Sequence, residues 1–390
     1  MIKKIQQDFS YYSHEFKDNY RKGVHRLRTI LASRAQAQAF VSNAGGVAVV
    51  LGYEPETPDK NAQELYALLA ASPYINNAVQ TFMGSIYEAG AESQDAMYAD
   101  SARCLEILHD PVLSRAAGAG TVSAGKWIAT LAGQSCNLYR DMNAVAASDI
   151  AMTAVAASET AMEAVISGTI ALNAVAASKT AMTAVAANET AMAAVAASRV
   201  AMSAIIGNST ALNAVVTSSV AMAAVIGNST ALNAVVSSQT AMTAVIGNSA
   251  ALNAVVSSQT AMTAVAASST AMTAIANNKT AITAVEASAV AKNALYNSPL
   301  KTSISNIAST SSWTTRRNGK IWLISFRQTW SSGNTSMQHR STLKDGGTVS
   351  CTASQSYNTD YRIDRFMDSI TNYNSAGGIG NVCTYYFIPC

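Results

Sequence analysis

Charged residues, proline and long apolar runs are all scarce in this chain of 390 residues. Only 13% of the residues are charged, against roughly 25% in typical soluble domains, and the net charge is +3. Disorder usually goes with high net charge and few apolar residues, whereas 49% of this chain is hydrophobic. No stretch approaches the ~18 uninterrupted apolar residues of a spanning helix, and the first twenty residues lack the apolar core of a secretory signal. The composition therefore predicts neither a disordered chain nor one inserted in a membrane.

Metal-ligating patterns are missing as well. The five cysteines form no CxxC pair, so neither a zinc site nor a disulfide framework is indicated. The four histidines show no spacing typical of metal ligands. We therefore expect no metal and no cofactor, in a chain made in a reducing cytoplasm. The cysteines are Cys104, Cys136, Cys351, Cys383 and Cys390.

A ten-residue repeat fills the middle of the chain. From residue 141 to residue 290 the sequence divides into fifteen decapeptides without insertion or deletion, such as AMTAVAASET (151–160) and ALNAVVSSQT (231–240). The consensus is Ala, Met or Leu, polar, Ala, Val, small, small, Ser or Asn, polar, Thr. Between residues 201 and 260, units with Ile-Gly-Asn at positions six to eight alternate with units carrying Val-Ser-Ser or Val-Thr-Ser. This alternation adds a second period of twenty residues.

Each decapeptide is predicted to be a helix of about two turns followed by a tight corner. Ala, Met and Leu favour helices, and no two-residue alternation indicates a strand. Ser or Asn at position eight suits the N-cap of the next helix, and Gly at position seven suits the left-handed residue that follows a helix. The alternative is one continuous Ala-rich coiled coil, although ten residues fall about 80° short of three helical turns.

Such short helices must stack on one another. Positions one, two, four, five and six cover an arc of about 200°, with Val near its centre, and positions three and nine lie opposite; a surface helix needs little more than ~100°. The predicted fold is therefore mainly α, an elongated fibrous array of stacked short helices. Three chains closing around an axis of Met, Leu and Val would bury this arc, and we favour that homotrimer. A single chain winding two or three decapeptides per coil would also bury it, and the twenty-residue period slightly favours this alternative.

Residues 1–140 form a helical region of different composition. They hold 13 basic and 13 acidic residues, half of the charges of the chain. Basic residues dominate the first 34 positions, which predicts a basic arm that docks on an acidic protein surface; the simpler interpretation is the solvated face of an amphipathic helix. Binding to nucleic acid is not expected. The docking candidates are Lys17, Arg21, Lys22, Arg26 and Arg28.

A small β-rich cap is predicted after the repeat region, which we place at 141–300. In residues 301–390 Ala nearly vanishes and three of the four Trp appear. The segment KIWLISFRQTW alternates as a strand with Trp322, Ile324 and Phe326 on one face, and Trp322 is expected in the core. Caps of different composition close the ends of repeat arrays.

Two patterns resemble catalytic motifs. Residues 120–126 satisfy GxxxxGK, but Trp127 follows where a phosphate-binding loop needs Ser or Thr, so a Gly/Ala turn is the better interpretation. Asp360, Asp364 and Asp368 have the spacing of one helix face and would suit glycoside hydrolysis, yet an exposed acidic face is more common. We therefore expect no enzyme.

The repeat array, with a helical region before it and a Trp- and Tyr-rich segment after it, resembles tail-fibre and fibre-like structural proteins of tailed bacteriophages. The resemblance covers about residues 141–310, and more loosely GKIWLISF and STLKDGGTVS in the cap. It implies a homotrimer, assembled in the host cytoplasm and carried on the virion. It also implies an N-terminus attached to other virion proteins of the tail, baseplate or collar, and a C-terminal tip that contacts the host.

The leading functional hypothesis is a virion fibre whose tip binds a bacterial surface glycan or protein, because exposed Trp and Tyr stack on sugars and anchor protein contacts. The alternative is a purely structural whisker, collar or connector fibre that links virion proteins without binding a receptor. Cleavage of surface glycan and ice binding through the Thr rows are less favoured. The receptor-binding candidates are Trp330, Tyr357, Tyr361, Arg362 and Tyr373.

Overall fold

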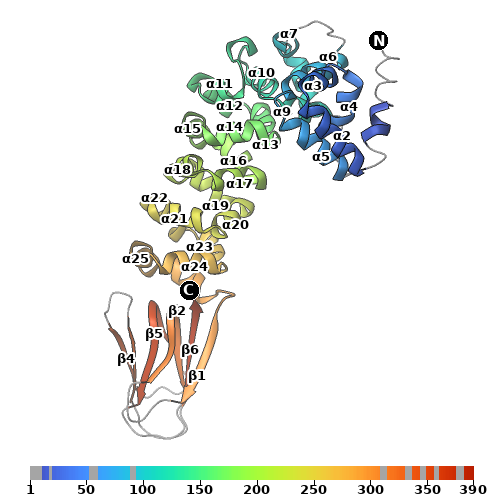
Figure 1. Ribbon diagram of the computed structural model, residues 1–390. Coiled ribbons are helices and arrows are strands. Elements are labelled where there is room, and N and C mark those ends of the chain that lie inside the picture. Colours follow the sequence, from blue (N-terminus) through green and yellow to red (C-terminus); the bar gives the residue numbers. More distant parts are fainter. Residues whose placement is uncertain are drawn as a thin grey trace. The chain divides into compact units, whose positions relative to one another are not determined.

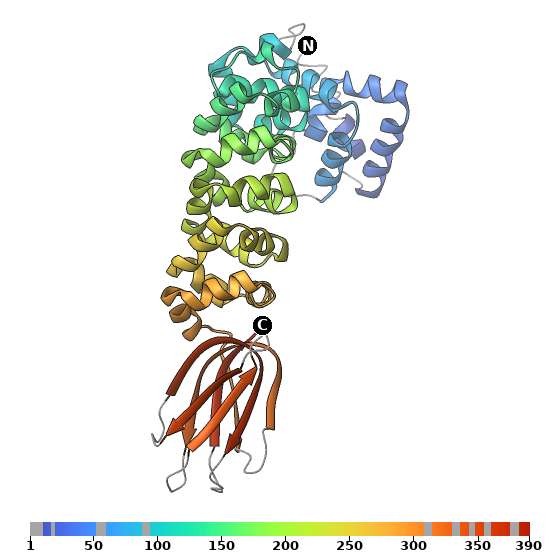
Figure 2. The same ribbon diagram turned by 90° about the vertical axis from the view of Figure 1, so that its left-hand side faces the viewer.

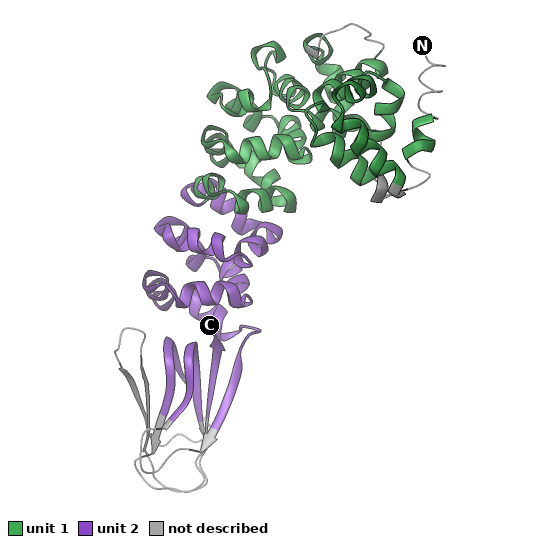
Figure 3. Cartoon of the chain, viewed as in Figure 1, with its two compact units in different colours: residues 1–215 green, residues 216–390 purple. Residues whose placement is uncertain are grey.

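The computed structural model contains helices up to residue 296 and strands from residue 302 onward (Figure 1). This mainly helical chain with a C-terminal antiparallel sheet is the predicted fold class in outline. Two compact units, residues 1–215 and residues 216–390, divide the chain within the repeat region (Figure 3). The structure describes residues 11–16, 20–51, 60–87, 94–307, 314–329, 336–342, 348–354, 360–374 and 382–390.

The first unit begins with an irregular helical bundle. Asp100 and Asp110 start two of its helices, because each carboxylate accepts two backbone N–H groups of the first turn. Trp127 is fully buried at the centre, and its ring N–H donates to the carbonyl of Cys104 at 3.0 Å. The helices are α2 Tyr20–Ala32, α3 Arg34–Val41, α4 Ala44–Leu51, α5 Lys60–Ala70, α6 Ile75–Ile86, α7 Gln94–Tyr98, α8 Ser101–His109, α9 Pro111–Ala119 and α10 Thr121–Leu131, with a 3-10 turn at Cys136–Leu138.

In the repeat region every decapeptide contributes one short helix, as predicted. Most run from position nine of one unit to position seven of the next, so that position eight alone lies outside the helix. In the first unit they are α11 Met142–Ala146, α12 Asp149–Ala157, α13 Glu159–Ser167, α14 Thr169–Ala177, α15 Lys179–Ala187, α16 Glu189–Ala197 and α17 Arg199–Gly207. The boundary between the units falls in α18 Ser209–Thr217. The second unit contains α19 Ser219–Gly227, α20 Ser229–Val236, α21 Gln239–Gly247, α22 Ser249–Ser257, α23 Gln259–Ala266, α24 Ser269–Ala276, α25 Lys279–Ala287 and α26 Ala289–Tyr296.

Position eight ends one helix and begins the next. Its backbone is extended. Its Ser or Asn side chain accepts the backbone N–H of the Ala three residues further along, in the first turn of the next helix, as Ser258 does from Ala261 at 3.2 Å. The predicted N-cap is therefore confirmed. The predicted left-handed Gly is wrong: Gly207, Gly227 and Gly247 are the last helical residues of α17, α19 and α21, and none has a positive φ. A single extended residue already turns the chain, so no left-handed residue is needed.

Three successive helices make one coil of the stack. Consecutive helices bend sharply, by 100° between α12 and α13 and by 96° between α14 and α15. Each helix then packs on the one three places further along, as α12 does on α15 in the first unit and α23 on α26 in the second. Serine hydroxyls tie neighbouring coils together by donating to a carbonyl 32 residues earlier, for example from Ser268 to Val236 at 2.6 Å. The repeat is thus a coil wound by one chain, and the continuous coiled coil is wrong.

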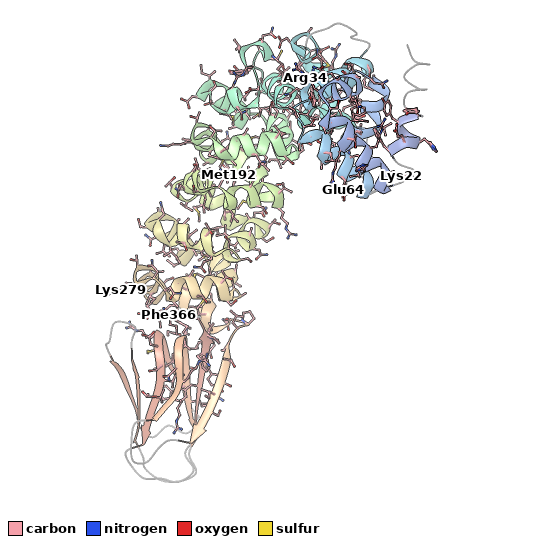
Figure 4. All side chains as sticks on the ribbon, viewed as in Figure 1. Lys22, Arg34, Glu64, Met192, Lys279 and Phe366 are labelled. Carbon is pink, nitrogen blue, oxygen red and sulfur yellow. The ribbon has the colours of Figure 1, made fainter. Side chains whose placement is uncertain are left out.

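Most of the apolar arc of each helix is buried within this coil, although Ala at position four is only half-buried in most units. Ala at position one, Met or Leu at position two and Val at position five are nearly all inaccessible to solvent, whereas position three is exposed. Met192 is an example in α16 (Figure 4). One chain therefore buries the side chains for which a three-chain axis was predicted. Homotrimer formation stays a prediction, but burial of the repeat does not require it.

The twenty-residue period has a simple consequence in such a coil. Because three helices form a coil and the two kinds of unit alternate, each unit stacks on one of the other kind. In the second unit, α19 with Met222 and Ile226 packs on α22 with Leu252 and Val256. Units with Met at position two and Ile at position six thus pack on units with Leu and Val at these positions.

A six-stranded antiparallel sheet ends the second unit (Figure 2). Its order is β1-β6-β2-β5-β3-β4. A bulge between Leu323 and Ser325 places Phe326 in one hydrophobic cluster with Ile321 and Leu323, while Trp322 packs against Phe366 instead. The single face predicted for Trp322, Ile324 and Phe326 is therefore wrong, although Trp322 is fully buried as expected. The strands are β1 Thr302–Ile307, β2 Thr314–Thr329, β3 Ser336–Thr342, β4 Thr348–Ser354, β5 Asp360–Asn374 and β6 Val382–Pro389.

Two glycines in helices should respond oppositely to replacement by Ala. A Cβ on Gly247 would meet nothing within 4 Å, whereas one on Gly125 would lie 2.4 Å from the backbone of Asp141 and Met142. We expect Gly247→Ala to stabilise the chain by about 0.5–1 kcal/mol and Gly125→Ala to destabilise it by about 1–3 kcal/mol. Urea unfolding followed by circular dichroism measures both. A stabilising Gly125→Ala would contradict the close approach of α10 to the start of the repeat.

Substitution of two serines at position eight distinguishes the contribution of helix capping from that of the hydrogen bond between coils. Ser258 only caps its helix, whereas Ser268 caps and also donates to Val236. We expect Ser258→Ala to lower the free energy of unfolding by about 1 kcal/mol, and Ser268→Ala by about 1 kcal/mol more. Equal losses in urea unfolding would mean that the bond between coils contributes nothing.

Candidate functional site

Three of the five predicted receptor-binding residues belong to strand β5 of the C-terminal sheet. Tyr361 and Tyr373 belong to β5, but their side chains lie outside the described part of the chain, as do Trp330 and Tyr357 entirely. Arg362 is therefore the one candidate of the five whose contacts the structure defines. Binding of a receptor by these residues stays a prediction.

Arg362 lies at the junction between the sheet and the last helix of the repeat. Its guanidinium donates to the carbonyl of Lys292 at 3.1 Å, lies 4.8 Å from the centre of the Tyr296 ring, and forms an ion pair with Asp364. A guanidinium over an aromatic ring is a favourable arrangement. Arg362 thus joins β5 to α26 within the chain.

Glu286 is the second connection at this junction. One of its carboxylate oxygens accepts a hydrogen bond from Arg365 at 2.7 Å, and the other accepts the backbone N–H of Phe366 at 3.0 Å. Position six, which Glu286 occupies in α25, is Ala, Ile or Val in the other units from 141 to 290. Its charge departs from the repeat because it binds the sheet rather than the neighbouring coil.

Aromatic side chains complete the junction. Trp322 and Phe366 make an edge-to-face pair with ring centres 4.9 Å apart, and both are buried. Lys320 also contacts the Asn277 side chain at the end of α24. The labels of Phe366 and Lys279 in Figure 4 mark the sheet and the helix α25 that meet here. The sheet therefore contacts all three helices of the last coil, and it closes that end of the stack.

Apart from Arg362 and Asp364, which were considered for other roles, these junction residues were not predicted as a site, although the sequence carried a signal. Glu286, Lys292 and Tyr296 replace the small or apolar residues that the consensus has at positions six, two and six. Departures from a repeat at its last units indicate a contact that the other units do not make. The consensus alone could not show that the partner would be β5.

The three aspartates of the glycoside-hydrolase hypothesis lie on a strand, so the predicted helix face is wrong. Asp364 has a φ of 52° at the irregular pairing of β2 and β5, and it pairs with Arg362. Burial raises the pKa of the Asp364 carboxyl above its ordinary value, although the Arg362 guanidinium opposes the shift. Asp364 is thus part of the junction, where its carboxylate holds Arg362.

Four of the five basic docking candidates belong to helix α2. Lys22, Arg26 and Arg28 are exposed, and the opposite face buries Val24, Leu27 and Ile30 against the bundle. Arg26 forms an ion pair with Glu15 at 2.8 Å. Lys17 and the side chain of Arg21 lie outside the described residues. The amphipathic helix is confirmed, and the docking role of its basic face stays a prediction.

The GxxxxGK segment is not a phosphate-binding loop. Its last six residues lie in α10, and Lys126 is buried. The Lys126 ammonium pairs with Asp95 and donates to the carbonyls of Cys136 and Tyr139 at 3.3 and 3.4 Å. A lysine engaged in this way does not reach a phosphate, so the motif's residues serve helix packing.

No metal site appears in the parts of the chain that the structure describes. No group of three His, Cys, Asp or Glu side chains there could hold a metal ion. A mainly apolar cavity of about 400 Å³ between α19 and α22 is lined by small residues and by Met222 and Ile226. Within the described ranges, no single helix is long and apolar enough to cross a membrane. Four pairs of consecutive helices would be long and apolar enough together, but each pair is sharply bent.

Comparison with known proteins assigns no family. No protein-family model matches the chain, and no curated protein matches it either.

Proposed function

We propose that this chain is a structural fibre of a tailed-bacteriophage virion, in which the helical N-terminal region attaches to the particle and the C-terminal sheet contacts the host surface. In this proposal the chain is a homotrimer without enzymatic activity, assembled in the host cytoplasm. Other tail, baseplate or collar proteins are the partners of the N-terminal region.

The observation that carries this proposal is the order of parts along the chain. A helical region with an exposed basic helix precedes sixteen consecutive short helices, and a sheet of different composition is fixed to the last two of them. Equivalent repeats that bury their faces against one another extend a chain by the addition of similar units. A repeat of this kind suits a spacer between two ends with different tasks.

The host-binding part is tested with the full chain and a tip variant. Fluorescently labelled chain is incubated with a panel of bacterial strains, and bound fluorescence is measured by flow cytometry. We expect binding to at least one strain and a loss of tenfold or more on joint replacement of Trp330, Tyr357, Tyr361 and Tyr373 by Ala. Replacing Tyr11 and Tyr74 in the N-terminal region provides an aromatic control that should bind normally. Equal binding by the tip variant and the wild-type chain would reject these residues as the receptor site.

The purely structural connector is the competing function, and it makes a different prediction on the particle. Antibodies against residues 301–390 should label a free end in electron micrographs of virions if the sheet is a host-contacting tip. An inaccessible C-terminal sheet on intact virions, with label appearing only on broken particles, would favour the connector and overturn the tip.

The N-terminal attachment is tested by reversing the charge of α2. We expect the triple variant Lys22→Glu, Arg26→Glu, Arg28→Glu to fold but to be missing from purified virions, since these side chains are exposed. Normal incorporation of this variant would remove the basic face from the attachment site.

A further inference from the structure

The charges of the C-terminal sheet lie on its inner strands. All ten Lys, Arg, Asp and Glu residues of the six strands belong to β2, β3 and β5, and none belongs to the outermost strands β1 and β4. Sheets usually show the opposite pattern, because Lys, Pro or bulges on an edge strand prevent it from pairing with another chain. Both edges of this sheet lack those devices.

The edge strand β1 is well suited to accept a further strand. It pairs along six residues with β6, from Thr302 to Ile307, without a bulge, and no other strand among the described residues pairs with it. Ser303 and Ser305 are exposed, while Ile304 packs against the hydrophobic cluster of the sheet. The nearest charge, Lys301, lies 4.8 Å from the Tyr296 ring and donates to the Tyr296 carbonyl. This lysine is held by α26, so it does not prevent another strand from pairing with β1.

The opposite edge strand β4 is close to β1 in length and runs in the opposite direction. It pairs along seven residues with β3, again without a bulge, and has no second partner strand in the described ranges. All neighbouring strands are antiparallel, so directions alternate across the six strands, and β1 and β4 run in opposite directions. A β4 strand of another copy placed beside β1 therefore continues the antiparallel pattern of the sheet.

We propose that copies of this chain associate through their sheets, with the β1 edge of one copy paired to the β4 edge of the next. Such a head-to-tail contact uses both bare edges, and a ring of copies leaves no edge unpaired. The inference rests on the proposed homotrimer only for the number of copies in the ring. The interface itself follows from the bare edges and from the alternation of strand direction.

The test blocks one edge at a time in the full chain. The β1 variant carries Ser303→Lys and Ser305→Lys, and the β4 variant carries Ser350→Lys and Thr352→Lys. The control carries Ser219→Lys and Ser249→Lys, at position nine of the repeat, where Lys179 and Lys279 already occur. Circular dichroism and thermal unfolding verify that each variant folds, and native mass spectrometry gives the number of chains.

We expect an oligomer for the wild-type chain and the control, and a mass of 40.6 kDa for each edge variant alone. A mixture of the two edge variants should give a dimer of twice that mass, because the first retains a free β4 edge and the second a free β1 edge. A β4 variant that still forms dimers alone would show that β1 pairs with itself and would overturn the proposal. A monomeric wild-type chain would overturn it too, together with the proposed homotrimer, and binding of that monomer to bacterial cells would leave the host-contacting part of the proposed function standing.

Discussion

Deleting ten residues from the repeat should do less damage than deleting five. Removal of residues 241–250 takes out one whole unit, so Ser238 caps a helix that begins with Gln239, Thr240 and Ala251 and the coil closes again. Removal of residues 241–245 leaves only four residues between the caps Ser238 and Asn248. Four helical residues span about 6 Å, against about 13 Å for the nine-residue helix that forms one side of the coil. The shorter deletion therefore opens the coil and exposes the cores on both sides.

The expected difference is large enough for thermal unfolding. The five-residue deletion also removes the buried side chains Ala241, Met242 and Val245, so we expect a loss on the order of 5 kcal/mol or more. The ten-residue deletion should keep the mean residue ellipticity and shift Tm by only a few degrees, because stability in repeat arrays is a sum over neighbouring units. Comparable destabilisation by both deletions would contradict a coil built from interchangeable ten-residue steps.

Much of the repeat could be predicted from its sequence because each unit carries a complete local signal. Ser or Asn at position eight favours an N-cap, and Ala, Met and Val mark the buried side of the short helix that follows. The number of helices per coil could not be predicted in this way. It depends on a bend of 95–100° at one extended residue, as between α12 and α13, and nothing in the type of that residue specifies this angle.

Gly at position seven suggested a left-handed backbone conformation that the structure does not have. Gly suits a left-handed residue after a helix, but at Gly247 the helix continues through the glycine and Asn248 turns the chain in an extended conformation. Other units have Ala or Ser at the same position, which already indicated that a positive φ is not required. Comparison among the units therefore indicates that a left-handed residue is not needed, whereas the three glycine-bearing units alone suggest the opposite.

The candidate site at the sheet was harder to predict because it depends on contacts between distant segments. Glu286 accepts hydrogen bonds from residues about 80 positions further along the chain, and a bulge near Ile324 reverses which side of β2 faces the cluster. Alternation in the sequence predicts a strand, but an unpredicted bulge exchanges the two faces after it. The aromatic residues were therefore assigned correctly to a β segment, and their faces were not.

Replacing Lys126 should be the most damaging single substitution of a polar residue in the first unit. Lys126→Ala removes the ion pair with Asp95 and leaves the carbonyls of Cys136 and Tyr139 without their donor. It also leaves a cavity where the lysine side chain was. Asp95 is partly exposed, which reduces the loss from its unpaired carboxylate, so we expect about 2–4 kcal/mol of destabilisation in urea unfolding. Because this ammonium joins α7, the turn after α10 and the start of the repeat, its loss should loosen all three.

The same substitution at Lys279 is the matched control. Lys279 is exposed at the start of α25, so Lys279→Ala should change the free energy of unfolding by no more than about 0.5 kcal/mol. Lys126→Met separates the two contributions of the buried lysine, since Met restores the packing of the stem but not the hydrogen bonds. If Lys126→Met were as stable as the wild-type chain, the ammonium would be dispensable, and the lysine of the GxxxxGK segment would need a role other than holding these helices together.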